Sequence, residues 1–98
     1  MSDPDTLAGR DEGDDVSGDG GVAERVLDYL ARSIVDDADS ISIERDSTRH
    51  GVVFRLHVAP DDMGKIIGRR GRVAQAIRTV VRAAGAREGI EATVDIVD

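Results

Sequence analysis

The chain has 98 residues, of which 20 are acidic and 13 basic, so its formal net charge is −7, and it contains no cysteine. A chain without cysteine forms neither a disulfide framework nor a thiolate metal site. No apolar run approaches the roughly 18 residues of a membrane span, and the acidic N-terminus is unlike a basic secretory signal, so we expect a cytoplasmic protein.

The first part of the chain is acidic and poor in apolar residues. Residues 1–20 carry seven acids and one base, and only Leu7, Ala8 and Val16 are apolar besides the initiator methionine. Such a segment cannot bury enough apolar surface to offset the entropy lost on ordering. We therefore predict a disordered acidic tail over residues 1–20 and a single small domain over residues 21–98.

The domain begins with one helical pattern and two strand patterns. In residues 21–35 the apolar side chains recur four positions apart, which predicts an amphipathic helix. Residues 41–44 alternate between apolar and polar and predict a short strand, and residues 52–58 alternate more regularly and predict a second one. The polar residues 46–51 between them predict the turn of an antiparallel hairpin.

Two helices and a third strand follow. The acids after Pro60 suit the first turn of a short helix, which we place at residues 61–67. Apolar residues at helical spacing predict a longer helix over residues 71–84, and Gly85 is expected to take the left-handed conformation that often follows a helix end. Residues 90–96 alternate again and predict the last strand.

The predicted order of elements is α-β-β-α-α-β. Two helices between the second and third strands are long enough for a right-handed crossover, so these two strands are predicted to be parallel. The fold class that follows is α+β. We expect a two-layer domain with a three-stranded mixed sheet and the helices on one face.

A basic loop bounded by glycines, Gly68-Arg69-Arg70-Gly71, joins the two consecutive helices. The first turn of a helix offers unpaired backbone N–H groups and the positive end of the helix dipole. Glycine has no Cβ atom to keep a sugar-phosphate backbone away from the main chain. Because Arg72 adds a third guanidinium group beside the loop, the pattern predicts a ligand rich in phosphates.

The negative net charge does not exclude nucleic acid, because the charge is unevenly distributed. Residues 65–87 carry seven bases and no acid, whereas residues 1–20 carry seven acids against one base. Exposed charges farther apart than about 8 Å are largely screened at physiological salt. A basic patch on an acidic protein can therefore bind RNA, and we expect the acidic tail to shield the patch when RNA is absent.

The Gly-x-x-Gly loop between two helices, in the order α-β-β-α-α-β, resembles the type II KH domain of bacterial RNA-binding proteins. The likeness covers residues 21–98 and is most detailed from Val58 to Val81. It implies a non-catalytic cytoplasmic protein that binds single-stranded RNA with low sequence specificity. It also implies a post-transcriptional regulator or RNA chaperone, linked in some bacteria to cell shape, and a homodimer or a heterodimer with a larger KH-containing protein.

The predicted RNA-binding residues are those of the loop and its flanks. They are Lys65, Ile67, Gly68, Arg69, Arg70, Gly71, Arg72 and Val73. Arg78 and Arg82 lie four apart on the polar face of the long helix, and the sequence leaves both open between RNA contact and ordinary solvated charge. Ala74 departs from the family pattern, because many KH domains have a larger aliphatic residue there. With one Phe and one Tyr in the chain, we expect affinity to come chiefly from phosphates.

No cofactor, metal site or catalytic group is predicted. The acids of residues 36–39 lack the pattern of a calcium loop, and residues 64–71 lack the Gly-Lys-Ser/Thr ending of a P-loop. The alternative to RNA binding as the main role is a protein-interaction subunit that dimerises with itself or with a larger KH-containing partner. Val53, on an otherwise polar strand face, and Ala83 and Ala84, at a helix end, are the hints of such a surface.

Overall fold

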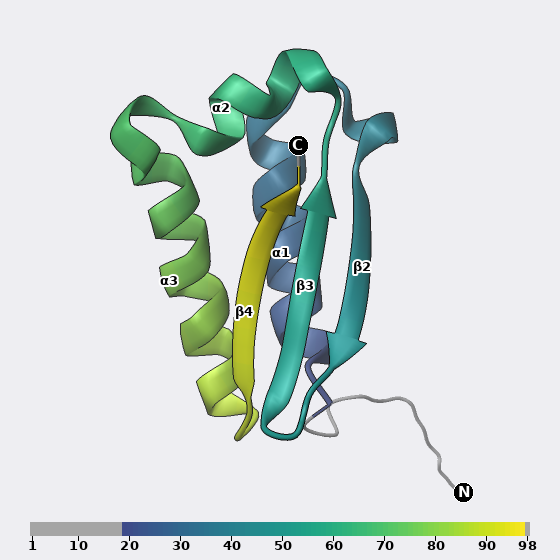
Figure 1. Ribbon diagram of the computed structural model, residues 1–98, viewed down its shortest axis with the longest axis vertical. Helices are drawn as coiled ribbons and strands as arrows, with labels where there is room; N and C mark the ends of the chain where they lie inside the picture. Colours follow the sequence, from purple (N-terminus) through teal and green to yellow (C-terminus); the bar gives the residue numbers. More distant parts are fainter. Residues whose placement is uncertain (1–18, 98) are drawn as a thin grey trace, which may run out of the picture.

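The computed structural model describes residues 19–97 (Figure 1), so most of the predicted acidic tail lies outside the described residues. The helices and strands follow one another in the predicted order. They are α1 (Gly21–Ile34), β2 (Ser42–Ser47), β3 (Gly51–His57), α2 (Met63–Ile67), α3 (Arg72–Arg87) and β4 (Glu91–Val97). Single 3₁₀ turns occur at Ala38–Ser40, Pro60–Asp62 and Arg69–Gly71.

The three strands form one mixed sheet in the order β2-β3-β4. Strands β2 and β3 are antiparallel, with Ile43 opposite Leu56, and β3 and β4 are parallel, with Phe54 opposite Val94. The parallel pair is possible because α2 and α3 carry the chain back to the starting end of the sheet. Figure 1 shows α1 behind the central strand, α3 beside β4, and α2 at one end of the domain. The predicted α+β fold class is confirmed.

The core lies between the sheet and the two long helices. Alternate side chains of β3, Val52, Phe54 and Leu56, are buried on one face of the sheet, as the period of two predicts. Leu27 of α1 and Val81 of α3 are fully buried in the same apolar cluster. Burying each large side chain of this kind contributes roughly 1.5 to 3 kcal/mol, so the cluster is what holds the helices on the sheet.

The prediction that Gly85 ends the long helix is wrong. Helix α3 continues to Arg87, and Gly85 is buried within it. A Cβ atom on Gly85 would lie 2.6 Å from the Cβ atom of Ala92, so the glycine allows α3 to pack closely against β4. The left-handed residue after the helix is Gly89, with φ at 81°.

The start of α1 is stabilised by a residue that is distant in the sequence. Gly20 precedes the helix and has no side chain to cap it. The carboxylate of Glu88, which follows α3, instead accepts a hydrogen bond of 3.1 Å from the backbone N–H of Ala23. A negative charge is favourable at a helix N-terminus, so this bond ties α1 to the segment that leads into β4.

Candidate nucleic-acid interface

The loop between α2 and α3 has an unusual backbone. Gly68, Arg70 and Gly71 all have positive φ angles, of 68°, 56° and 74°. Arg70 is the only non-glycine residue with positive φ in the part of the chain that the structure describes. This conformation costs a residue with a Cβ atom about 1 to 2 kcal/mol, and such strain is concentrated at functional sites.

The two loop glycines have different surroundings. A Cβ atom on Gly68 would lie 2.4 Å from Cγ2 of Val73, so Gly68 is required for the packing of the loop on α3. A Cβ atom on Gly71 would meet no heavy atom within 4 Å. The main chain at Gly71 is therefore open to an approaching ligand.

Arg69, Arg70 and Arg72 line a single hollow of about 290 Å³. Among residues 19–97, none of these three guanidinium groups forms an ion pair. Helix α3 starts at the same point, and its N-cap residue, Gly71, offers no side-chain hydrogen bond to the first-turn N–H groups. In the described residues, guanidinium groups without an ion-pair partner beside a helix N-terminus that has no side-chain cap form a site suited to anions.

The other predicted site residues fall into two groups. Ile67 at the end of α2 is 41% exposed, and Val73 in the first turn of α3 is partly buried against the core. Both flank the loop and offer it apolar surface. Lys65 is engaged elsewhere, because its ammonium group forms ion pairs with Asp36 and, at 3.5 Å, with Asp62. Residues 67–73 are thus grouped at the loop, whereas the ammonium group of Lys65 is paired with two acids.

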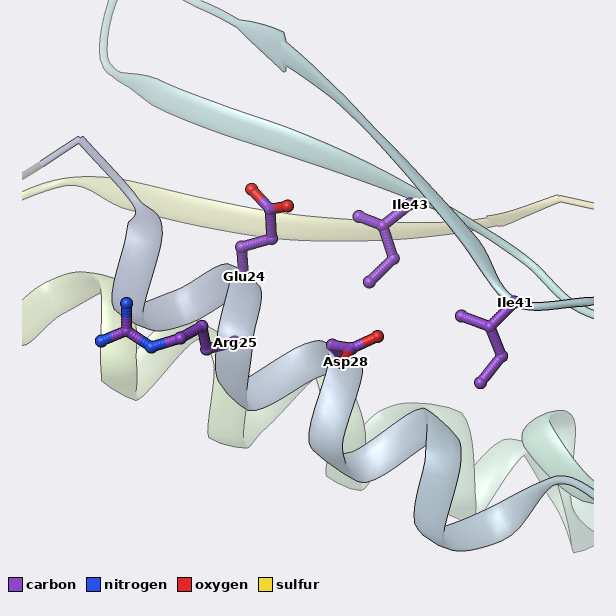
Figure 2. Close-up of a pocket in the computed structure, with 5 residues that line it drawn as sticks. All are labelled: Glu24, Arg25, Asp28, Ile41 and Ile43. Atoms are coloured by element: carbon purple, nitrogen blue, oxygen red, sulfur yellow. The ribbon is translucent and has the colours of Figure 1, made fainter. Parts of the chain in front are cut away.

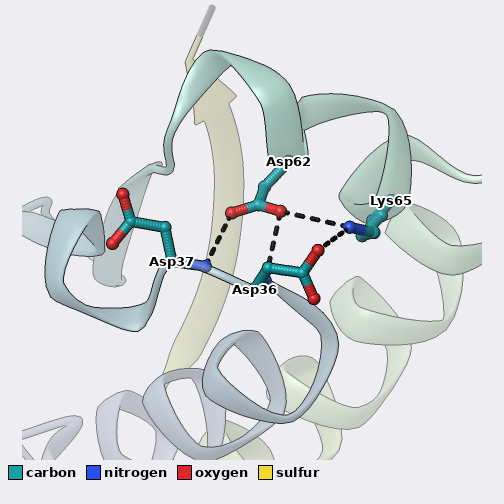
Figure 3. Close-up of polar contacts among 4 residues, drawn as sticks. All are labelled: Asp36, Asp37, Asp62 and Lys65. Carbon is teal, nitrogen blue, oxygen red and sulfur yellow. Dashed lines mark hydrogen bonds and ion pairs between the residues drawn. The ribbon is translucent and has the colours of Figure 1, made fainter.

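Asp62 organises the segment that leads into the loop. Its side chain is buried, and its two carboxylate oxygens accept hydrogen bonds from the backbone N–H groups of Asp36 (3.1 Å) and Asp37 (3.0 Å), as Figure 3 shows. These two bonds, reinforced by Lys65, hold the pKa of Asp62 below its ordinary value. The hydrogen bond to Asp36 raises the pKa of Lys65. The network ties the end of α1 to the start of α2.

This network is a feature that the sequence did not reveal. An aspartate shortly after Pro60 predicts a residue at a helix start, and Asp62 does precede α2. Nothing in the pattern shows that its carboxylate is turned toward a segment 25 residues earlier in the chain. The partners are backbone groups, which every residue has, so no residue type marks them in advance.

A second hollow, of about 280 Å³, lies between α1 and the start of strand β2. Figure 2 shows the residues that line it: Glu24, Arg25, Asp28, Ile41 and Ile43. Two carboxylates against one guanidinium group make it unsuited to a polyanion. Within residues 19–97 no group of three or more His, Cys, Asp or Glu side chains is arranged to hold a metal ion. No helix in that range is long and apolar enough to cross a membrane.

The α-β-β-α-α-β fold with a Gly-x-x-Gly loop between α2 and α3 defines a type II KH domain, a nucleic-acid-binding module. Residues 24–96 match the family model described as KhpA/KhpB, KH domain. Because this match covers most of the chain, the chain belongs to the KhpA/KhpB family.

Three relatives from different bacterial genera are each named RNA-binding protein KhpA. The Streptomyces coelicolor protein is 47% identical over 75 residues, which cover 76% of this chain and 91% of the relative. The Mycobacterium tuberculosis protein is 46% identical over 72 residues, covering 74% and 86%. The Clostridium acetobutylicum protein is 39% identical over 74 residues, covering 76% and 99%. The names of these relatives thus describe RNA-binding proteins.

Proposed function

We propose that this protein binds single-stranded RNA through residues 68–71 and the first turn of α3, with low sequence specificity. The observation that supports this most directly is the hollow lined by Arg69, Arg70 and Arg72 at an uncapped helix N-terminus. Phosphates recur at every nucleotide, so guanidinium and backbone N–H groups can grip RNA of any sequence. A KH module of this kind clamps about four nucleotides.

The flanking residues would complete the site. Ile67 and Val73 offer apolar surface on either side of the loop, against which bases can rest in place of aromatic stacking. Lys65 would be a peripheral contact. The side chain of its partner Asp36 is 83% exposed, and exposed ion pairs contribute little, so a phosphate could replace Asp36 as the partner of Lys65.

A double charge reversal tests the proposal. We expect Arg69→Asp with Arg70→Asp to abolish binding of a fluorescent octamer of uridine, while the melting temperature stays nearly unchanged. Both side chains are exposed, and aspartate tolerates the left-handed conformation of residue 70 better than most residues. The matched control is Arg25→Asp with Arg49→Asp, which changes the net charge equally at exposed positions outside the loop. Retained affinity in the loop variant would refute the assignment.

We also propose where and how this activity is used. The relatives named RNA-binding protein KhpA support RNA binding. On that basis we propose a cytoplasmic role as a post-transcriptional regulator or RNA chaperone, with effects on cell shape as a downstream consequence. Crosslinking in cells followed by RNA sequencing would identify the targets. Recovery of no more RNA than with the loop variant would contradict this role.

Assembly is a second candidate function, either with another copy of the chain or with a larger KhpB-type protein. Val80 on α3 is 45% exposed, and Ala76 and Ala83, also exposed, lie four residues before it and three after it on the same helix face. The sequence also pointed to Val53 and Ala84, but both are only partly exposed. Light scattering with and without the uridine octamer separates the roles. A dimer that ignores RNA favours assembly, and a monomer excludes self-association.

A further inference from the structure

Arg78 bridges α3 and the open edge of the sheet. Strand β4 is an edge strand, and Figure 1 shows α3 along the side of β4 that faces away from β3. The Nε–H group of Arg78 donates a hydrogen bond of 3.2 Å to the carbonyl oxygen of Val94 in the middle of β4. The guanidinium group therefore lies where α3 and the strand edge meet.

This hydrogen bond fixes the orientation of a planar group and leaves most of its donors free. Arg78 is partly buried, and within residues 19–97 its two Nη atoms have no hydrogen-bond or ion-pair partner. A guanidinium group held at Nε presents its Nη–H donors as a fixed pair. Arg82, one turn later, is exposed and forms no such bond in the same part of the structure.

Arg78 lies on the same helix as the hollow lined by Arg69, Arg70 and Arg72, which we call the arginine hollow. Gln75, Arg78 and Arg82 follow one another at spacings of three and four residues, so they share one strip of the α3 surface, which begins one turn after Arg72. Arg78 lies seven residues after Gly71, which is about 10 Å along the helix axis. Four nucleotides span more than this distance, so a strand held at the loop and running along the β4 side of α3 reaches Arg78.

We propose that Arg78 reads one base of the bound RNA and favours guanine or cytosine over adenine or uracil at that position. Two parallel N–H donors need two adjacent acceptors. Guanine presents O6 and N7, and cytosine presents O2 and N3, whereas in adenine and uracil an N–H donor stands beside the acceptor. The proposal rests on the proposed function and refines it, since specificity at a single position leaves the overall sequence preference low.

The test uses four octamers: uridine alone, and uridine with one central guanosine, cytidine or adenosine. Because the strand can shift its register on the loop, a single substituted base can reach Arg78. We expect the native protein to bind the guanosine or cytidine octamer at least about fivefold more tightly than the adenosine octamer. Arg78→Ala and Arg78→Lys should bind all four octamers equally. Lysine keeps the charge but lacks the paired donors, and it covers the case in which alanine unfolds the protein.

Arg82→Ala is the matched control, because it removes the same charge one turn away without touching the β4 edge. It should keep the base preference while its overall affinity falls slightly. A native protein without base preference, or an Arg78→Ala variant that retains the preference, would overturn the proposal. A variant with a lower melting temperature and an unchanged base preference would show that Arg78 only braces β4. In each of these cases the octamers still bind, so the proposed function would stand.

Discussion

A Cβ atom on Gly68 would lie 2.4 Å from Cγ2 of Val73, whereas one on Gly71 would meet nothing within 4 Å. Both glycines have positive φ, so alanine is strained at either position. We expect Gly71→Ala to lower the free energy of unfolding by about 1 kcal/mol, and Gly68→Ala, which adds the steric overlap, by about 2 to 4 kcal/mol. Urea denaturation measures both values.

The same substitutions separate folding from binding. Gly71→Ala places a methyl group where the main chain is open to the ligand, so RNA affinity should fall by more than its small loss of stability explains. Gly89→Ala is the matched control, because Gly89 also has positive φ and open space around it but lies at the far end of α3. If both variants bind the uridine octamer equally well, close approach of RNA to Gly71 is ruled out.

Asp62 should make the stability of the domain depend on pH in the acid range. Its pKa in the folded protein is below its ordinary value, so its contribution is fully present above the unfolded-state pKa of about 3.9. That contribution is lost as the pH falls through the folded-state value. We expect Asp62→Asn to melt at a lower temperature than the native protein at pH 7, and the difference to shrink progressively below about pH 4.

Asp61→Asn is the control for Asp62, because the neighbouring side chain is exposed and accepts no hydrogen bond in residues 19–97. At pH 7 it should melt close to the temperature of the native protein. Lys65 behaves in the opposite sense, since its pKa is raised and its contribution is lost only in the alkaline range, above about pH 10. A difference between Asp62→Asn and the native protein that stays constant from pH 7 to pH 3 would exclude the ionised carboxylate as the source.

Glu88 should stabilise α1 from outside the helix. Glu88→Ala removes the acceptor of the Ala23 N–H and the negative charge beside the helix N-terminus. Losses of this kind cost about 1 kcal/mol, which in a domain of this size lowers the melting temperature by about 4 to 8 °C. Glu91→Ala, at an exposed position three residues later, should have little effect. Equal melting temperatures for the two variants would show that the bond contributes nothing.

The architecture could be predicted from the sequence because it depends on patterns within single segments. The alternation at residues 52–58 and the four-residue spacing in residues 21–35 placed β3 and α1 correctly. Strand β2 runs to Ser47, three residues beyond the predicted end, because its last residues are polar on both faces and their strand conformation comes from pairing with β3. Pairing of this kind is invisible in a single segment.

The candidate site was predictable only in part, for a related reason. The glycines and arginines of the sequence identified the loop at residues 68–71. They did not show that Gly68 packs against Val73 while the space around Gly71 is open. The same limit produced the error at Gly85. A glycine near a helix end predicts left-handed backbone, but Gly85 is needed for its contact with Ala92 of another element, β4. The role of a glycine depends on its contacts with other elements, and these contacts cannot be read from the sequence.

Phosphate binding at the loop implies a defined dependence on salt. If three or four phosphates are neutralised, the slope of log K against log salt should be about −2 to −3, a loss of about 20- to 60-fold in affinity between 50 and 200 mM. Arg72→Ala removes one of the three guanidinium groups of the hollow, so it should reduce the slope by about 0.7. Arg25→Ala should leave the slope unchanged. An Arg72→Ala variant with the native slope would place the phosphates elsewhere.

Removal of residues 1–18 should tighten RNA binding at low salt. These residues carry six acids and one base, and the described chain begins with Asp19 next to α1. The hydrogen bond between Glu88 and Ala23 joins that point to the far end of α3, about 24 Å along the helix from the arginine hollow, and 18 residues can span up to about 60 Å. The acids can therefore reach the loop and compete with phosphates.

The competition is electrostatic, so its effect must fade as salt rises. We expect the dissociation constant of the shortened chain to be several-fold lower than that of the full chain at 50 mM salt and equal to it well above 200 mM. A full-length variant with the six acids changed to Asn or Gln separates charge from length, and it should match the shortened chain. Equal dissociation constants for the full and shortened chains at 50 mM salt would remove the idea that the tail shields the loop.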